Sequence, residues 1–417
     1  MKPVDSMMSA MPILGRNLAG GSRASRNEGA RQDVDKSQGN HTKILFVCNF
    51  LSKGWEVSIL GLLAFVQQQY ALHLYMVGIL SAVFIVSQIS ISFFAGQIAH
   101  ALQSRNVIFL SIAASAGAWL TLSLSSHVSL LYLAYMLGGI SSGLFEPIGN
   151  SLVAKCSSAK NRGTAIGNFA ACGDMGRIAV VAAATALAGL LGVNHACGIL
   201  FLSALVALIL AIIFIPSATG SERPAEEVPV RLAELLQNRN FCFATAAGIA
   251  DSFSSASLYI FIPFLLSAKG IALANTLYFN VIFFAGYMSG RLALGRLADR
   301  YNASHTLIVA QLTMAALLLL LVWVTGMIPT IILLFLLGIF TRGTSPIIRA
   351  MVADSLDERI SFHNAFSAYA FASRSSSAIC RPIYGFLASY AGIGAVFYAA
   401  SAVSLCTLYP AAKYNSR

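Results

Sequence analysis

The stretch ILFVCNFLSKGWEVSILGLLAFV, residues 44–66, is long and apolar enough to cross a lipid bilayer, yet Lys53 and Glu56 lie near its middle. About 20 apolar residues span the hydrocarbon core of a membrane. A charged side chain at that depth costs roughly 2.5–3.5 kcal/mol on insertion scales, so it persists where it faces a protein interior, an opposite charge or a watery cavity. The two charges are three residues apart and share one helix face. The stretch therefore predicts a membrane helix that lines a polar path.

Seven further ionisable side chains lie inside stretches that are otherwise typical of membrane helices. They are Glu146, Asp174, Arg177, Asp251, Arg342, Arg374 and Arg381. Counted inward from the expected helix ends, most of them fall at a similar depth. Scattered structural ion pairs need not share a depth, whereas a site near the bilayer midplane produces this pattern. We therefore expect the chain to handle a polar or charged solute within the membrane.

The composition excludes an ordinary soluble protein. Hydrophobic residues make up 57% of the chain and charged residues 10%, whereas a soluble domain has about 25% charged residues. The net charge of +11 lies mainly near the N-terminus and in alternate loops, which is typical of membrane topology and not of nucleic-acid binding. The cysteines are dispersed without a CxxC pair, and the histidines lack metal-ligand spacing. With no phosphate-binding GxxxxGK loop either, we expect no metal, no cofactor and no ATP site.

The apolar runs predict twelve membrane spans, six on each side of a polar break. The expected spans lie near residues 44–66, 75–99, 106–125, 129–154, 164–192, 195–215, 241–267, 273–295, 305–326, 329–352, 363–389 and 392–411. Sliding the chain by about 200 residues sets Gly163–Asp174 against His363–Arg374 and matches Ala165 with Ala365, as in transporters built from parallel repeats. We therefore expect an all-α membrane protein with two pseudo-symmetric six-helix bundles.

The polar break and the chain ends predict five segments of different character. They are a disordered cytoplasmic tail at 1–42, a first bundle at 43–216, a cytoplasmic linker at 217–240, a second bundle at 241–412 and a short cytoplasmic tail at 413–417. Lysines and arginines concentrate in the loops on one side, with Lys269 as the main exception. Because the positive side of a membrane protein is cytoplasmic, we expect both termini inside, in a bacterial inner (plasma) membrane.

The segment GRLADR, residues 295–300, follows the eighth expected span. It resembles the G-x-L-A-D-R signature of the major facilitator superfamily. The resemblance implies a conformational latch made of Gly295, Asp299 and Arg300. In such a latch the glycine permits a tight turn, and the aspartate faces a neighbouring helix N-terminus.

The resemblance extends over residues 43–412 but is weaker in the first half. There the corresponding segment is GQIAH, residues 96–100, in which His100 replaces the expected aspartate. In the superfamily, spans one, four, seven and ten line the central cavity. The residues that this places at the cavity are Lys53, Glu56, Glu146, Asp251 and Arg342.

Side-chain chemistry suggests a role for each of these charges. We expect Lys53, Arg342 and Asp251 to bind the solute, with the arginine fork holding a negative group. We expect Glu146 to be the leading proton carrier, followed by Glu56 and Asp251, because carboxylates in a low-dielectric site can exchange protons. The other charges, expected as buried pairs that either serve the site or only lock helices together, are Asp174, Arg177, Arg374 and Arg381.

The sequence thus predicts a secondary active transporter of a small polar, anionic or zwitterionic organic solute, working by alternating access and coupled to protons. Its partners would be the solute, protons and the lipid bilayer, and we expect a monomer. Uptake of a metabolite and export of a siderophore or drug both fit. The alternatives are a membrane-embedded enzyme, for which the sequence offers no nucleophile or metal cluster, and a transporter-like sensor that signals through its tail.

Reporter fusions test the expected orientation. A reporter placed after residue 222 or at the C-terminus should lie in the cytoplasm, and one placed after Ser126 should lie outside, because positively charged loops stay inside. The measurement uses paired reporter enzymes that are each active on one side of the membrane. A cytoplasmic signal at Ser126 would contradict the twelve-span topology.

Overall fold

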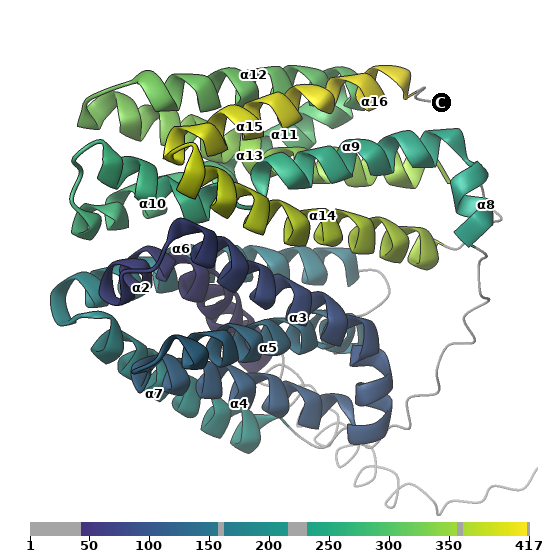
Figure 1. The fold of residues 1–417 in the computed structure, drawn as a ribbon. Helices are drawn as coiled ribbons and strands as arrows, with labels where there is room; N and C mark the ends of the chain where they lie inside the picture. The colour runs from purple at the N-terminus through teal and green to yellow at the C-terminus, as the bar shows by residue number, and fades with distance from the viewer. Residues whose placement is uncertain (1–42, 157–161, 216–231, 357–361, 415–417) are drawn as a thin grey trace, which may run out of the picture.

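The described part of the chain folds into α-helices joined by short turns (Figure 1). The structure is a computed structural model, and it describes residues 43–156, 162–215, 232–356 and 362–414. The expected tail at 1–42, the first part of the linker and the last residues of the chain lie outside the described residues. The predicted all-α membrane fold is confirmed.

The first half contains six helical segments of membrane-spanning length. They are the span Lys43–Tyr70, whose last part is α2 (Leu63–Tyr70), then α3 (Leu74–Leu102), α4 (Ser104–Ser123), α5 (Val128–Cys156), α6 (Arg162–Leu191) and α7 (Val193–Phe214). Each lies within a few residues of an expected span, because long apolar runs leave little freedom in placing a membrane helix.

The second half begins with the short helix α8 (Leu232–Gln237) and repeats the plan with two interrupted helices. Its elements are α9 (Arg239–Ser255), α10 (Leu258–Ala268), η1 (Leu273–Asn275), α11 (Thr276–Arg300), α12 (Ala303–Trp323), α13 (Met327–Asp354), α14 (Phe362–Tyr390), α15 (Ile393–Cys406) and α16 (Leu408–Lys413). The interruptions lie between α9 and α10 and between α15 and α16, so each of these pairs forms one span-length segment.

Ten helical segments among the described residues are long and apolar enough to cross a membrane. The other two long helices, α11 and α14, have 25 and 29 residues but are more polar. Their polar residues include arginines that contact the first half, so these helices keep polar faces away from lipid. That they too cross the membrane, which would complete the count of twelve, stays a prediction.

Two glycines reveal the internal repeat at the level of backbone geometry. Gly192 joins α6 to α7 with a φ of 84°, and Gly392 precedes α15 with a φ of 85°. Glycine adopts positive φ without the steric penalty of a Cβ atom. The two positions are 200 residues apart in the numbering, which agrees with the offset of the sequence repeat.

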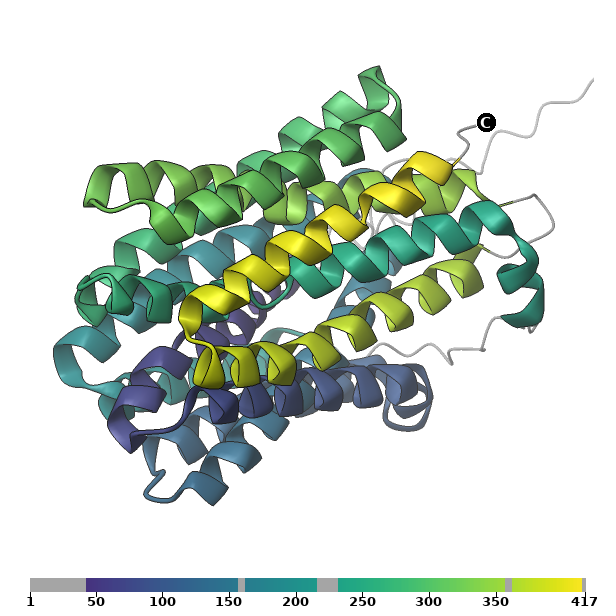
Figure 2. The same ribbon diagram turned by 45° about the horizontal axis from the view of Figure 1, so that its top comes forward.

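The two halves pack against each other through two helix pairs, α3 with α14 and α6 with α11 (Figure 2). In the first pair Gly78 faces Gly385. A Cβ atom at position 78 would lie 2.5 Å from the backbone oxygen of Arg381 and 3.0 Å from the Cα atom of Gly385. Cβ atoms do not approach a backbone this closely, so these glycines allow the helices to meet backbone to backbone.

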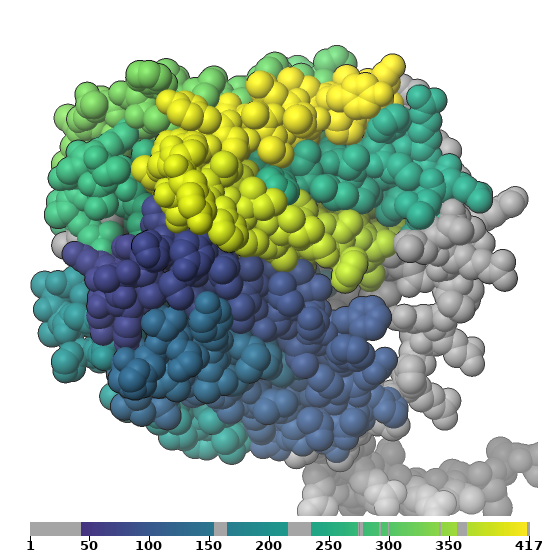
Figure 3. All heavy atoms as spheres, viewed as in Figure 1, coloured from purple at the N-terminus to yellow at the C-terminus, as the bar shows by residue number. Residues whose placement is uncertain are grey.

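The contact between the halves is tightest at the end of the molecule that lies away from α8. There the backbone N–H of Tyr75 donates to Ser389 Oγ at 2.8 Å, α2 contacts α10, and α6 contacts η1. Figure 3 shows atoms of the two halves packed directly against each other at this end. Toward α8, helices α3 and α14 diverge, as both ribbon views show (Figure 1, Figure 2).

Lys269, the exception to the loop-charge pattern, has a structural role. It follows the segment Arg239–Ala268, and its Nζ donates to the backbone oxygens of Leu321 and, at 2.6 Å, Val324. These carbonyls end α12, where a cation is favourable. Burial lowers the pKa of the Lys269 ammonium, because the charged form loses contact with water.

Replacing Lys269 by methionine should therefore lower the stability of the fold. Methionine keeps the length of the side chain but leaves two helix-end carbonyls without their donor, a loss of about 1–2 kcal/mol. The melting temperature of the purified protein measures this. Lys413→Met, at the exposed end of α16, is the matched control and should have no effect. Equal melting temperatures for the two variants would contradict the capping role.

Candidate functional site

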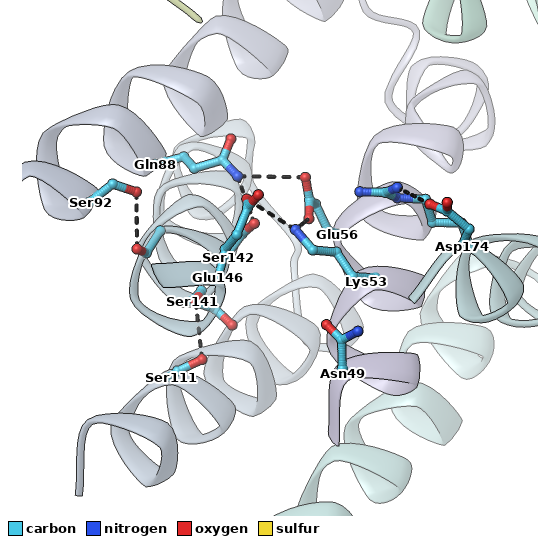
Figure 4. A network of polar contacts seen from close by, with 12 residues as sticks. Asn49, Lys53, Glu56, Gln88, Ser92, Ser111, Ser141, Ser142, Glu146 and Asp174 are labelled. Carbon is cyan, nitrogen blue, oxygen red and sulfur yellow. Dashed lines mark hydrogen bonds and ion pairs between the residues drawn. The ribbon is translucent and has the colours of Figure 1, made fainter. Parts of the chain in front are cut away.

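Lys53 lies between two carboxylates, one on its own helix and one on α5 (Figure 4). Its Nζ is 2.8 Å from Glu56 Oε2, one turn along the same helix, and 3.1 Å from Glu146 Oε2 on α5. Only 11% of the Lys53 side chain is exposed. The three charges of the first and fourth spans that were expected at the cavity therefore meet in one cluster.

Glu146 also contacts the second half. The same oxygen, Oε2, accepts a hydrogen bond from Arg374 Nη2 of α14 at 3.1 Å. One carboxylate oxygen is thus shared by a cation of the first half and a cation of the second half. Because charge-assisted bonds of this kind are strong where water is scarce, Glu146 ties the halves together at this point.

A second carboxylate repeats this arrangement on the neighbouring helix pair. Asp174 on α6 accepts from Arg177, one turn along the same helix, and from Arg291 on α11. The Tyr287 ring lies near both arginines, with its centroid 5.9 Å from Arg177 Cζ and 6.0 Å from Arg291 Cζ. The Tyr287 hydroxyl also accepts from Arg177 Nη1 at 3.2 Å. Asp174, like Glu146, is therefore shared between the halves.

The two carboxylate centres belong to one electrostatic network. Arg177 interacts with Lys53, Glu56 and Glu146 as well as with Asp174. We call the seven side chains of both centres the seam network; they are Lys53, Glu56, Glu146, Asp174, Arg177, Arg291 and Arg374. Its members come from the first span, α5, α6, α11 and α14, and so from both halves of the fold.

Gln88 on α3 contacts the Glu56 carboxylate of the network. Its Nε2 donates to Ser142 Oγ at 2.7 Å and lies 3.5 Å from Glu56 Oε1. Gln88 and Ser142 are both buried, so this amide helps to orient Glu56 through Oε1, the oxygen that does not contact Lys53. Figure 4 shows Gln88, Glu56 and Lys53 pointing toward one another from two helices.

We expected Asp251 to bind solute and carry protons, but its described hydrogen bonds do not involve the seam network. It is buried within the second half, where its Oδ1 accepts from Gln311 Nε2 at 2.6 Å and from Thr344 Oγ1 at 2.8 Å. Ser404 extends this group by donating to Gln311 Oε1 at 2.6 Å. These partners come from α12, α13 and α15, so they link helices of one half.

Arg381 was expected to belong to a buried charge pair, but its described partner is a neutral backbone oxygen. Its Nη1 donates to the backbone oxygen of Ser81 on α3 at 2.7 Å, and the residue is 3% exposed. Its buried Nε has no hydrogen-bond partner in the described part of the structure. Arg342 lies in α13, and its side chain is outside the described residues.

The expected latch segment, residues 295–300, forms the last turns of α11. The expectation that Gly295 permits a tight turn is wrong, because the helix continues to Arg300. Among the described residues, a Cβ atom at Gly295 would meet Pro346 Cβ, at 4.0 Å, and so has ordinary van der Waals space. The side chain of Asp299 is outside the described residues, and the exposed Arg300 has its Cζ 5.9 Å from the Tyr301 ring centroid.

Sequence reasoning missed Arg291, Tyr287 and Gln88. Arg291 lies four residues before the expected end of its span, where an arginine is typical of a cytoplasmic helix end. Because α11 continues to Arg300, Arg291 is nine residues from the helix end and lies inside the seam. The position of Arg291 within the expected span 273–295 was the signal that could have identified it as a buried charge. Gln88 is uncharged, and no pattern in the sequence separates it from other polar residues of membrane helices.

The described residues hold no cluster of histidine, cysteine, aspartate and glutamate side chains that could bind a metal ion. What the site offers is a set of paired charges between two helical halves. Such an arrangement can bind a charged solute, exchange a proton and respond to the relative position of the halves.

Fold and seam together define a membrane transporter built from two repeated helical halves. The sequence model of the Major Facilitator Superfamily matches residues 44–286 and 244–414, and the chain belongs to this superfamily. A crystal structure of a D-xylose-proton symporter matches with a TM-score of 0.73, covering 90% of this chain and 97% of that chain at 14% sequence identity. This likeness shows the fold alone. The comparison with curated proteins gives no match.

A double-mutant cycle on Asp174 and Arg291 tests whether their pair holds the halves together. Asp174→Asn and Arg291→Gln should each lower the melting temperature, because each removes a charge-assisted bond between the halves. The double variant should lose less than the sum, by a coupling of about 0.5–3 kcal/mol. A second cycle, with the exposed Arg239→Gln in place of Arg291→Gln, should be additive. Additivity in both cycles would contradict the link.

Proposed function

We propose that the protein is a proton-coupled secondary transporter of an organic anion or zwitterion. One observation carries the proposal, namely that Glu146 Oε2 contacts both Lys53 and Arg374, which belong to opposite halves. Glu146 occupies the position that an anionic group of the solute would need. It therefore acts as an internal substitute for the solute when the site is empty.

Coupling to protons follows from charge balance. Lys53 and Arg374 favour the ionised form of Glu146. A proton therefore binds to Glu146 only when another anion pairs with these two cations in its place. An incoming carboxylate supplies that anion, and the fork of Arg374 can hold it through two parallel hydrogen bonds. The solute and the proton therefore enter the site together, and neither is stable there alone.

Transport follows if the halves rock about the seam. Lys53 would move with the first half and Arg374 with the second. The anion between them, either Glu146 or the solute, therefore keeps both contacts only at certain separations of the halves. Ionised Glu146 and a bound solute each bridge the two cations, and these are the two states in which the halves can change position. A protonated, empty site leaves the cations repelling each other and does not support the change.

This assignment changes the roles expected from the sequence. Arg374 takes the part expected of Arg342, because its contact with Glu146 is direct. Glu146 stays the leading proton carrier, and Glu56 is second because it shares Lys53. Asp251 becomes a structural group of the second half. With the expected topology, the proton gradient of a bacterial inner membrane would drive a monomer of this transporter.

Glu146→Gln is the decisive variant, since glutamine resembles the protonated carboxyl group but cannot release a proton. A solute is first identified by its effect on the melting temperature of the purified protein. In proteoliposomes, the variant should keep counterflow exchange of that solute within a few-fold but lose accumulation driven by a pH gradient. Asp354→Asn, at the exposed end of α13, is the matched control and should keep both.

Two results would overturn the proposal. Gradient-driven accumulation at the normal level by Glu146→Gln would remove this residue from the coupling step. Failure of the unmodified protein to exchange any stabilising solute would instead favour a sensor or an enzyme.

A further inference from the structure

Positive charge exceeds negative charge at the seam between the halves. Among its described side chains, the seam network has four cations, namely Lys53, Arg177, Arg291 and Arg374, against the carboxylates of Glu56, Glu146 and Asp174. Arg381 adds a further cation, and its described partner is a neutral backbone oxygen. Such an excess is costly in a membrane interior, where charges persist in pairs.

Arg381 is an unusual part of this excess. The residue is 3% exposed, yet it uses one guanidinium nitrogen on Ser81 and leaves a buried Nε without a hydrogen bond in the described structure. A guanidinium offers donors in a planar fork, and a buried donor without an acceptor destabilises the state that contains it. Arg381 therefore fits a role in a state in which an additional acceptor is present.

Arg374 and Arg381 lie on the same side of α14. They are seven residues apart, which places them two turns apart on one helix face, about 10 Å along the axis. Both reach across the seam to the first half, Arg374 to Glu146 and Arg381 to Ser81. The helix thus presents a row of two arginines to the partner half.

The contact of Arg381 lies where the halves have to separate for access from the side away from α8. Ser81 is one turn from Gly78, whose backbone meets that of Gly385 at the tightest point of the seam. Opening that end would withdraw the Ser81 carbonyl from Arg381. The guanidinium would then be left with free donors facing the opened space.

We infer that the transported solute is a dicarboxylate, with one carboxylate in the position of Glu146 between Lys53 and Arg374 and the other on Arg381. This rests on the proposed function and adds the class of solute. The carboxylate of Glu146 is already held between Lys53 and Arg374, so this position suits a carboxylate of the solute. A solute with two negative charges also offsets more of the positive excess than a solute with one.

Purified full-length protein allows a direct test. The probes are straight-chain dicarboxylates from succinate to sebacate, each compared with its own monomethyl ester, which has the same chain but one charge fewer. Calorimetry should give an affinity at least about tenfold higher for the best dicarboxylate than for its monoester. The optimum should lie among the longer members, because two helical turns separate the arginines.

Variants assign the second carboxylate to Arg381. Arg381→Gln should lower dicarboxylate affinity to the level of the monoester while leaving monoester affinity within about twofold, and Arg381→Lys should restore part of the difference. Arg239→Gln, an exposed arginine at the start of α9, should change neither. A purely structural Arg381 would lower stability without changing the ratio of the two affinities.

The inference is overturned if dicarboxylates and monoesters bind equally to the unmodified protein, if neither series binds, or if Arg381→Gln keeps the ratio. None of these readouts uses a proton gradient, so the Glu146→Gln transport assay judges the proposed function separately. Loss of the dicarboxylate preference with intact proton coupling would leave an organic-anion transporter of another class.

Discussion

The shared Glu146 carboxylate is the interaction on which the arrangement of this molecule depends. Lys53, deep in the first half, would be strongly unfavourable in a membrane without a counter-ion, and the same is true of Arg374 in the second half. Both cations meet on one oxygen of Glu146. Helices α5 and α14 must therefore approach at this level, although they are separated by more than half of the chain.

The halves are joined both by apolar packing and by polar links. The larger cluster of buried apolar side chains includes residues of both halves, and a smaller cluster lies within the second half. Across the seam the described polar links are few and directional, such as Asp174 with Arg291 and Arg381 with the Ser81 carbonyl. Directional bonds can be exchanged for others of similar strength, while a packed core resists deformation. If the halves rock as proposed, these polar links are the contacts that can be exchanged during the motion.

How far the sequence predicts this structure depends on the range of each interaction. The helices were predictable because span length and apolar composition are local properties. The contact of Lys53 with Glu56 was predictable because residues three apart share a helix face. The pairing of Glu146 with Arg374 joins residues 228 apart, and no local pattern carries that information. Arg291 was missed because the end of α11 is polar, so hydropathy placed the helix end too early.

Asp251 and Glu146 show why residue type and depth do not suffice to assign a proton carrier. Both are carboxylates on spans expected at the cavity, and the sequence, although it favoured Glu146, does not show where the partners of either residue lie. The described partners of Asp251, Gln311 and Thr344, belong to its own half and move with it. A proton can shift a conformational equilibrium only as far as it binds the two conformations differently. The described hydrogen bonds of Asp251 lie within one half, whereas protonation of Glu146 would change a bond between the halves, and this is the reason for proposing Glu146 before Asp251 as the coupling residue.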